Sequence, residues 1–222
     1  MSNASPRLPA PTRLTSGRAA SRIQAQVAQL SPDANDRQHA LRQIVAGADR
    51  ATRVLEQLLR LARLDSLARL PNRVEIDLAE LARQALADIR HTVEVRDIRL
   101  ETAGSPLLVR GDAELLQIVL RNLLDNALRY TPADSRIHVF ACRQGGELSL
   151  GVADDGPGVP PTELPRLVER FYRGREASAE GSGLGLAIVQ RIAELHDARF
   201  EVENLAAGGF TARLRWCRAP AA

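Results

Sequence analysis

Residues 181–189 read Gly181-Ser182-Gly183-Leu184-Gly185-Leu186-Ala187-Ile188-Val189, with three glycines at alternate positions that run directly into an apolar helical pattern (here the Gly181 loop, residues 181–185). A second glycine loop precedes it, Asp154-Asp155-Gly156-Pro157-Gly158 (the Asp154 loop). Glycine lets backbone N–H groups approach a phosphate closely, and a helix that begins just after such a loop directs its free N–H groups and positive dipole end at the same anion. The two loops together predict a nucleotide site.

The composition narrows the kind of nucleotide site, because the chain contains no lysine and all 30 of its basic residues are arginines. P-loop nucleoside triphosphatases and the protein kinases that carry a strand lysine both hold phosphate with a lysine, so both classes are excluded. Any phosphate must therefore be held by backbone amides, arginine and a metal ion.

Length and charge exclude further classes of protein. With 222 residues, 45% of them hydrophobic, the chain can form one globular domain and a smaller element. The net charge is only +3 and aromatic residues make up 3%, so we expect no nucleic-acid partner. Cys142 and Cys217 follow no metal or redox spacing, which indicates a reducing cytoplasm. No apolar run reaches the roughly 18 residues that span a bilayer. We therefore expect no membrane segment in this chain.

The first third of the chain has a heptad pattern, in which apolar residues recur alternately three and four positions apart. These residues form a predicted apolar seam: Leu41, Ile44, Ala48, Ala51, Leu55, Leu58 and Ala62. A shorter match at residues 20–30 precedes turn and helix-capping residues at 31–36, which predicts a helical hairpin that ends near Pro71. Two helices cannot cover the seam, so we expect a homodimeric four-helix bundle. The alternative is that the seam packs on the rest of its own chain.

Beyond residue 70 the pattern becomes mixed α/β. Amphipathic periodicity predicts helices over 78–90 and 113–130, the second capped by Asp112. Alternating patterns predict strands over 98–101, 107–109, 137–141, 147–152, 200–202 and 211–216, with turns at Gly145-Gly146 and Gly208-Gly209. Helices with hairpin-connected strands favour a two-layer α/β sandwich with an antiparallel or mixed sheet.

The helix over 113–130 carries two asparagines on one face, Asn122 and Asn126, with Arg129 and Tyr130 one turn further on. Asparagine is unfavourable within a helix because its side chain competes for backbone hydrogen bonds. Amide oxygens are hard, neutral ligands suited to Mg²⁺ near phosphate, and arginine can pair with phosphate oxygens. The alternative is a polar exposed face.

Four segments resemble, in order and spacing, the nucleotide-binding boxes of sensor histidine kinases. Leu123–Pro132, Val152–Pro160, Glu169–Gly174 and Gly181–Val189 resemble the N, G1, F and G2 boxes. The resemblance covers residues 19–216 and implies an α+β chain with a dimerisation hairpin at residues 19–70. It also implies an ATP-binding two-layer α/β sandwich at 71–218, of the gyrase, chaperone, histidine kinase and mismatch-repair superfamily. Residues 1–18 are expected to be an irregular segment without family resemblance.

The resemblance implies a site for ATP and Mg²⁺. Asp154 matches the carboxylate that accepts a hydrogen bond from the adenine amino group, and Asn126 matches the Mg²⁺ ligand. Asn122 is the first N-box asparagine, while Arg129 and Tyr130 match positions that contact phosphate and ribose or base. Phe171 matches the aromatic anchor of a mobile lid, with a core phenylalanine as the alternative. The other implied cofactor-binding residues are Gly156, Gly158, Arg173, Gly181, Ser182, Gly183, Leu184, Gly185 and Leu186.

Asn122 bears on the type of reaction. In the related ATPases, the residue four before the metal-binding asparagine is a glutamate that activates water. Asn122 stands at that position here, and an amide cannot accept a proton at neutral pH. Attack of water on ATP should therefore be slow, which favours a kinase over an ATPase.

The phosphoacceptor histidine of the family is not identified. Alignment from Ile23–Gln26 places its box at residues 12–18, where Thr12 replaces the histidine, and none of the four histidines lies in such a box. A misassigned start, a fusion remnant and a degenerate box all stay open as explanations.

Two functional hypotheses follow from these observations. The first is the ATP-binding core of a two-component sensor histidine kinase, truncated and defective in self-phosphorylation, that passes the γ-phosphate to a histidine for relay to a response regulator receiver domain. The second is an ATP-gated dimeric interaction module without kinase activity. We expect a cytoplasmic location, although full-length relatives are usually anchored in the inner membrane.

Overall fold

The computed structural model describes residues 22–23, 25–89, 97–104, 106–174 and 181–217. The chain divides into two compact units, Met1–Glu56 and Gln57–Ala222. The segment 1–18 and Thr12 lie outside the described residues. The helical N-terminal region and the α/β sheet that follows confirm the α+β class predicted from the sequence.

The first unit contains the predicted turn between two helical segments. Residues 22–23 and 25–30 are helical, and α2 (Ala34–Ser66) begins just after the turn. Asp33 caps α2, since its Oδ1 accepts a hydrogen bond from the Asn35 N–H at 2.7 Å. The Arg37 guanidinium closes the turn by donating to the carbonyls of Ser31 and Pro32, both at 2.9 Å. The hairpin is therefore held by its own local polar contacts.

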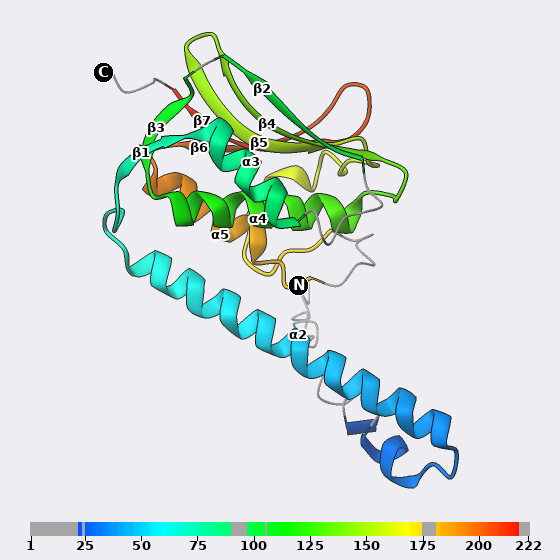
Figure 1. Ribbon diagram of the computed structural model, residues 1–222. Helices are drawn as coiled ribbons and strands as arrows, with labels where there is room; N and C mark the ends of the chain where they lie inside the picture. Colours follow the sequence, from blue (N-terminus) through cyan, green and yellow to red (C-terminus); the bar gives the residue numbers. More distant parts are fainter. Residues whose placement is uncertain (1–21, 24, 90–96, 105, 175–180, 218–222) are drawn as a thin grey trace, which may run out of the picture. The chain divides into compact units, whose positions relative to one another are not determined.

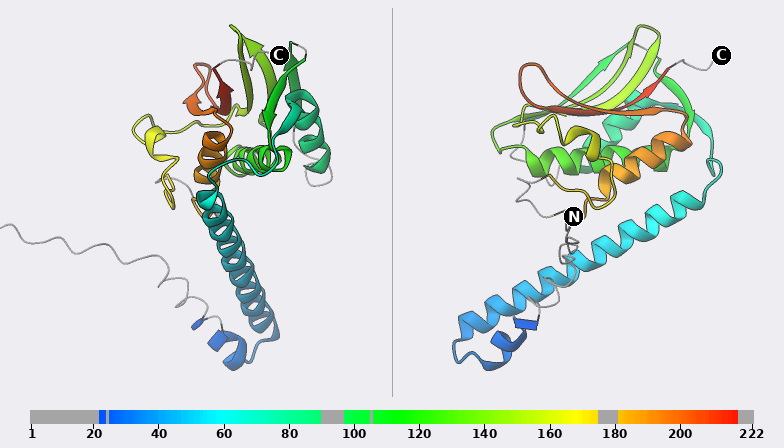
Figure 2. Two further views of the ribbon diagram at one scale, coloured as in Figure 1. Left: turned by 90° about the vertical axis from the view of Figure 1, so that its left-hand side faces the viewer. Right: turned by 180° about the vertical axis from the view of Figure 1, so that it is seen from behind.

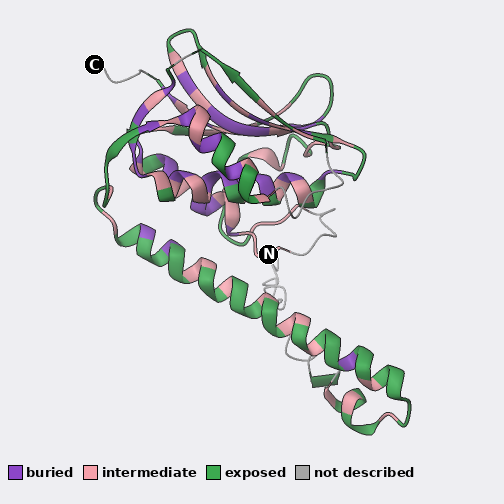
Figure 3. Ribbon diagram, viewed as in Figure 1, coloured by how far each residue is buried: buried purple, intermediate pink, exposed green. Residues whose placement is uncertain are grey.

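Many residues along helix α2 are exposed to solvent (Figure 3), and several of them are apolar. Leu41, Val45, Leu55 and Leu59 are between 54% and 61% exposed. Of the predicted seam, Leu41 and Leu55 belong to this exposed set, whereas Ile44 and Leu58 are partly buried. An isolated amphipathic helix with such a face leaves apolar area in contact with water.

The second unit is built on a five-stranded sheet with strand order β2-β4-β5-β7-β6 (Figure 1). The strands are β2 (Asp97–Ala103), β4 (Arg136–Gln144), β5 (Glu147–Asp154), β6 (Arg199–Asn204) and β7 (Phe210–Trp216). β2 runs parallel to β4 and every other neighbouring pair is antiparallel. A separate two-stranded sheet pairs β1 (Val74–Asp77) with β3 (Leu108–Gly111).

Three helices form the second layer of the sandwich: α3 (Leu78–Ile89), α4 (Ala113–Tyr130) and α5 (Gly185–Leu195). They cover one face of the five-stranded sheet (Figure 2). Strand residues alternate accordingly: Ile137, Val139 and Ala141 are fully buried toward the helices, and the residues between them are only partly buried. Apolar burial between sheet and helices is thus the main stabilising contribution.

The predicted helices and strands occur at the expected places, and α4 spans the predicted residues 113–130. Its cap is the predicted one, since Asp112 Oδ1 accepts a hydrogen bond from the Leu115 N–H at 3.1 Å. Strand β1, which was not predicted from the sequence, pairs with β3. It has only four residues, too few for its alternating pattern to be distinctive.

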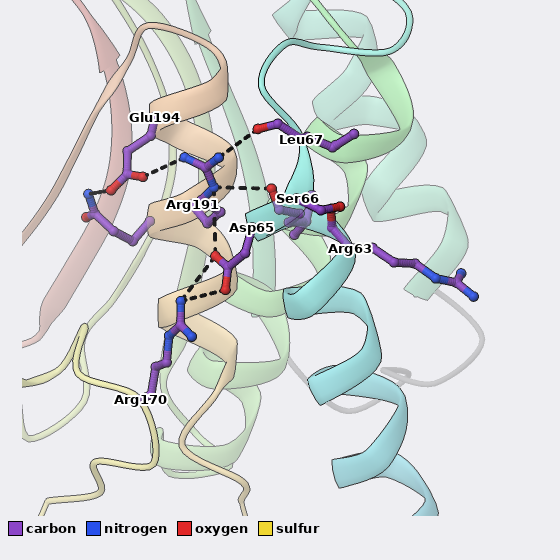
Figure 4. A network of polar contacts seen from close by, with 9 residues as sticks. Arg63, Asp65, Ser66, Leu67, Arg170, Arg191 and Glu194 are labelled. Atoms are coloured by element: carbon purple, nitrogen blue, oxygen red, sulfur yellow. Dashed lines mark hydrogen bonds and ion pairs between the residues drawn. The ribbon is translucent and has the colours of Figure 1, made fainter.

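The last turns of α2 belong to the second unit, so the compact units divide before the sequence boundary expected near residue 70. Leu61 and Leu64 are buried, and a polar network joins the end of the helix to the sandwich (Figure 4). Asp65 accepts hydrogen bonds from the Arg170 guanidinium at 2.8 and 3.1 Å. Arg191 of α5 donates to the Leu64 carbonyl at 3.2 Å and to the Leu67 carbonyl at 2.9 Å.

Candidate nucleotide site

Asp154 ends β5 and is buried, with 9% of its surface exposed. Its Oδ1 accepts a hydrogen bond from the Gly156 N–H at 3.0 Å. Burial raises the pKa of Asp154, and hydrogen bonds from the Gly156 N–H and Thr131 partly oppose that rise. A buried carboxylate oriented in this way can accept a further hydrogen bond from the exocyclic amino group of adenine. Guanine has no amino group at the same ring position.

The Asp154 loop needs both of its glycines. A β-carbon at Gly156 would lie 2.8 Å from Asp154 Oδ1, so a larger residue would displace the carboxylate. Gly158 has φ +71°, a conformation that other L-residues rarely adopt. Asp155 accepts a hydrogen bond from the Arg136 N–H at 2.6 Å. That role needs only an acceptor, so the carboxylate meets it.

Asn122 and Asn126 lie one turn apart on α4, both partly buried. The Asn122 Nδ2 donates to the Ile118 carbonyl at 2.8 Å. Its Oδ1 faces the start of α5, because a β-carbon at Gly185 would lie 3.0 Å from that oxygen. The predicted N-box asparagine and the last glycine of the Gly181 loop are therefore neighbours.

The Gly181 loop also meets the end of α4. A β-carbon at Gly181 would lie 3.1 Å from Arg129 Nη1 and 3.4 Å from Tyr130 Oη. Within the loop, Ser182 Oγ accepts a hydrogen bond from the Leu184 N–H at 3.1 Å, and the Leu184 side chain is fully buried. This anchoring fixes the start of α5, whose first N–H groups are available to an anion.

The F-box segment is joined to the same loop through backbone atoms. The Phe171 N–H donates to the Gly183 carbonyl at 2.9 Å, and a β-carbon at Gly183 would lie 2.7 Å from the Phe171 carbonyl carbon. Phe171 has φ +65° and is 58% exposed, so it is not a core phenylalanine in this structure. Arg173 follows on the same segment, and Leu186 is partly buried in the first turn of α5.

Three residues that sequence reasoning had not assigned to the site support its framework. Thr131 follows α4, and its side chain lowers the pKa of Asp154. Buried His196 accepts a hydrogen bond at Nε2 from the Asp112 N–H at 3.0 Å, and its Nδ1 pairs with the Ile192 carbonyl at 2.8 Å. Asn204, at the end of β6, bonds the backbone of Val159. Thr131 could have been found from its position inside the N-box segment, but nothing in the local sequence marks Asn204.

The residues present fit an adenine nucleotide. A buried acceptor stands at one glycine loop, while arginine, tyrosine and a helix N-terminus meet at the other. Among the described residues no three His, Cys, Asp or Glu side chains are grouped to hold a metal ion. A divalent cation at this site would rely on the neutral oxygen of Asn126 together with phosphate oxygens and water, because Mg²⁺ keeps several waters and takes further ligands from substrate phosphates.

Comparison with known proteins places the chain in a family. Residues 111–220 match the family model described as histidine kinase-, DNA gyrase B- and HSP90-like ATPase. The sensor protein QseC of Salmonella typhi is 46% identical over 206 residues, which cover 91% of this chain and 45% of QseC. The solved cytoplasmic segment of histidine kinase QseC is 36% identical, with a TM-score of 0.52, over 77% of this chain and 94% of that segment. The chain belongs to the sensor histidine kinases.

This membership confirms the resemblance drawn from the four boxes. The full-length protein ShkA, solved in complex with AMPPNP, is 25% identical with a TM-score of 0.67, over 94% of this chain and 44% of ShkA. The chain spans about 45% of the length of QseC. Among the described residues, no helix has the length and apolarity required to cross a membrane.

Proposed function

We propose that this histidine kinase binds Mg·ATP between the Asp154 loop and the Gly181 loop and uses it to phosphorylate a histidine for relay to a response regulator receiver domain. The buried carboxylate of Asp154 is the observation that carries this proposal. The AMPPNP bound to ShkA supports an ATP-like ligand. The solved QseC segment is described as cytoplasmic, and we propose the same compartment for this chain.

Each group has a role that follows from its chemistry. Asp154 accepts a hydrogen bond from the adenine amino group, which orients the base. Arg129 and the first N–H groups of α5 hold phosphate oxygens, and Tyr130 contacts the ribose or base. Asn126 would hold Mg²⁺, which supplies charge neutralisation to the phosphates when bound. These contacts position the γ-phosphate, and positioning supplies most of the rate in phosphoryl transfer.

Asn122 favours transfer to a protein acceptor over hydrolysis. Its Nδ2–H already donates a hydrogen bond to the Ile118 carbonyl, and an amide oxygen is too weak a base to activate water. We therefore expect slow hydrolysis of bound ATP in the absence of an acceptor histidine.

The hairpin is proposed to dimerise. The exposed apolar residues of α2 include the predicted seam positions Leu41 and Leu55, and a second copy would present the same face in a two-fold arrangement. Packing two such hairpins as a four-helix bundle would bury these side chains. We retain residues 19–70 as the dimerisation region and 71–218 as the catalytic domain.

A second function is favoured by one observation, which is that Thr12 stands where the acceptor histidine is expected. A threonine hydroxyl needs a base to become a nucleophile, whereas a neutral imidazole is competent at pH 7. We propose that this chain is defective in self-phosphorylation. It would then act as an ATP-gated dimeric interaction module through the same nucleotide site.

The nucleotide assignment is tested by Asp154→Asn with isothermal calorimetry of Mg·ATP. The amide presents a donor where the adenine amino group needs an acceptor, so affinity should fall by about 1–3 kcal/mol, or roughly 5- to 150-fold. Asp155→Asn is the matched control, because an amide oxygen can still accept from the Arg136 N–H. Equal ATP affinity for wild type and Asp154→Asn would contradict the adenine assignment.

A further inference from the structure

Asn204 holds the Asp154 loop through two hydrogen bonds to one residue. Its Nδ2 donates to the Val159 carbonyl at 2.6 Å, and its Oδ1 accepts from the Val159 N–H at 2.8 Å. The side-chain amide thus pairs with Val159 as a neighbouring strand would, at the last residue of β6. Both bonds are partly buried, so losing them would leave backbone groups incompletely satisfied.

The two hydrogen bonds between Asn204 and Val159 are called the Asn204 clamp. The strand register explains why this clamp reaches the nucleotide site. Phe210 of β7 is paired with Asp154 on one side and with Asn204 on the other. The chain leaves β5 at Asp154, and Val159 is bonded to Asn204 two strands away. Asp154 and Asn204 therefore hold the two ends of the same short loop.

Glycines allow the loop to fit between these two attachments. A β-carbon at Gly158 would lie 2.9 Å from Asn204 Oδ1, so the clamp itself requires a glycine there. Gly209 has φ +105°, and a β-carbon there would overlap the Asp154 carbonyl oxygen. The turn that holds Gly209 is closed by a hydrogen bond from the Leu205 N–H to the Gly209 carbonyl at 3.1 Å. The turn between β6 and β7 thus packs directly against the start of the loop.

We infer that Asn204 is a positioning residue for adenine recognition, acting through Val159 to hold the Asp154 loop in its base-binding conformation. The inference rests on the proposed function, since it concerns the same nucleotide site. If the loop occupies this conformation for only a fraction of the time, the apparent affinity is the intrinsic affinity multiplied by that fraction. Removing the amide should therefore weaken ATP binding by roughly 3- to 10-fold, the effect of about one net hydrogen bond.

The test compares ATP and GTP binding by calorimetry in wild type, Asn204→Ala and Asn204→Asp, with the thermal midpoint of each protein measured without nucleotide. A carboxylate at 204 can still accept from the Val159 N–H but cannot donate to the Val159 carbonyl. Both variants should bind ATP more weakly and should lose part of the preference for ATP over GTP. The matched control is Glu203→Ala on the same strand, which removes an ion pair with Arg213 at 3.0 Å and leaves Val159 untouched. That control should keep the wild-type preference.

A second variant changes Gly158, the residue that packs against the Asn204 side chain, and keeps the test decisive if Asn204→Ala does not fold. Gly158→Ala places a methyl group against Asn204 Oδ1 and should reproduce the loss of ATP preference. Wild-type preference in the Asn204 variants, or equal losses for ATP and GTP, would overturn the inference while leaving the proposed function intact. Absence of ATP binding by the wild type would instead overturn the proposed function, and the inference with it.

Discussion

His196 offers the sharpest test of how the framework of the nucleotide site is held together. The imidazole is 1% exposed and links α5 to the N-terminus of α4. Its Nε2 accepts from the Asp112 N–H, so the proton must be on Nδ1, which donates to the Ile192 carbonyl. Protonating Nε2 would place its N–H against the Asp112 N–H, so that two hydrogen-bond donors would face each other. Burial lowers the pKa of His196 below its ordinary value of 6.5.

His196→Gln removes this arrangement while keeping a side chain of similar size. A glutamine cannot satisfy both the Asp112 N–H and the Ile192 carbonyl in the same geometry, and each unsatisfied buried group costs free energy. At pH 8 we expect the free energy of unfolding to fall by about 2–4 kcal/mol. For a unit of this size, that loss corresponds to a decrease in melting temperature of about 4–15 °C.

The pH dependence of the unfolding free energy tests whether buried His196 is neutral in the folded protein. Because the folded-state pKa is lowered, the unfolded chain binds a proton near pH 6.5 before the folded chain does, and wild type loses stability as the pH falls below that value. The glutamine variant has no such titration. The difference in unfolding free energy between the two should thus be largest above pH 7 and should shrink between pH 6.5 and the folded-state pKa.

Urea unfolding followed by tryptophan fluorescence measures this difference, since Trp216 is the single tryptophan and lies in the sandwich. Its Nε1 donates to the His196 carbonyl at 3.1 Å, so circular dichroism should serve as a second probe. His138→Gln is the control: this histidine lies on β4, is 27% exposed and pairs with Glu101, so its loss should cost less than about 1 kcal/mol. A stability gap between wild type and His196→Gln that stays constant from pH 8 to pH 5 would refute the reasoning.

The remaining predictions concern assembly, catalysis and the end of α2. Leu55→Arg should convert a dimer into monomers in light scattering, because it places an unpaired charge in the apolar interface; a wild type that is monomeric at tens of micromolar would rule out the bundle. Radiolabelled ATP should give negligible labelling of the chain, and replacing residues 12–18 with a histidine-containing acceptor box should produce an acid-labile label. Strong acid-labile labelling of the unmodified chain would show that the acceptor lies elsewhere, and His39 would be the first residue to mutate. Asp65→Asn should cost less than about 1 kcal/mol of unfolding free energy, since its ion pairs are partly exposed. Arg191→Gln should cost more, because this arginine also donates to two backbone carbonyls at the end of α2, and equal losses in urea unfolding would contradict that ranking.

The sequence predicted those features that depend on local pattern. Helix α4 was expected over the residues it occupies because apolar side chains repeat along one face and Asp112 can cap only a helix that begins at the next residue. The glycine loops were expected to bind phosphate through backbone N–H groups, which requires conformations that favour glycine. The positive φ of Gly158 and Gly183 agrees with that expectation. The Mg²⁺ ligand Asn126 and the dimeric bundle stay predictions.

Other features were decided only by the tertiary structure. β2 joins the sheet in parallel beside β4, although they are distant in sequence and no turn signal connects them. His196 reaches Asp112 across 84 positions, Asn204 reaches Val159 across 45, and Arg170 reaches Asp65 across 105. A polar side chain at a strand or helix end can satisfy many partners, so its own sequence position does not specify which one it meets. Periodicity determines which face of an element is buried, whereas the pairing of distant polar groups depends on how the assembled layers bring those groups together.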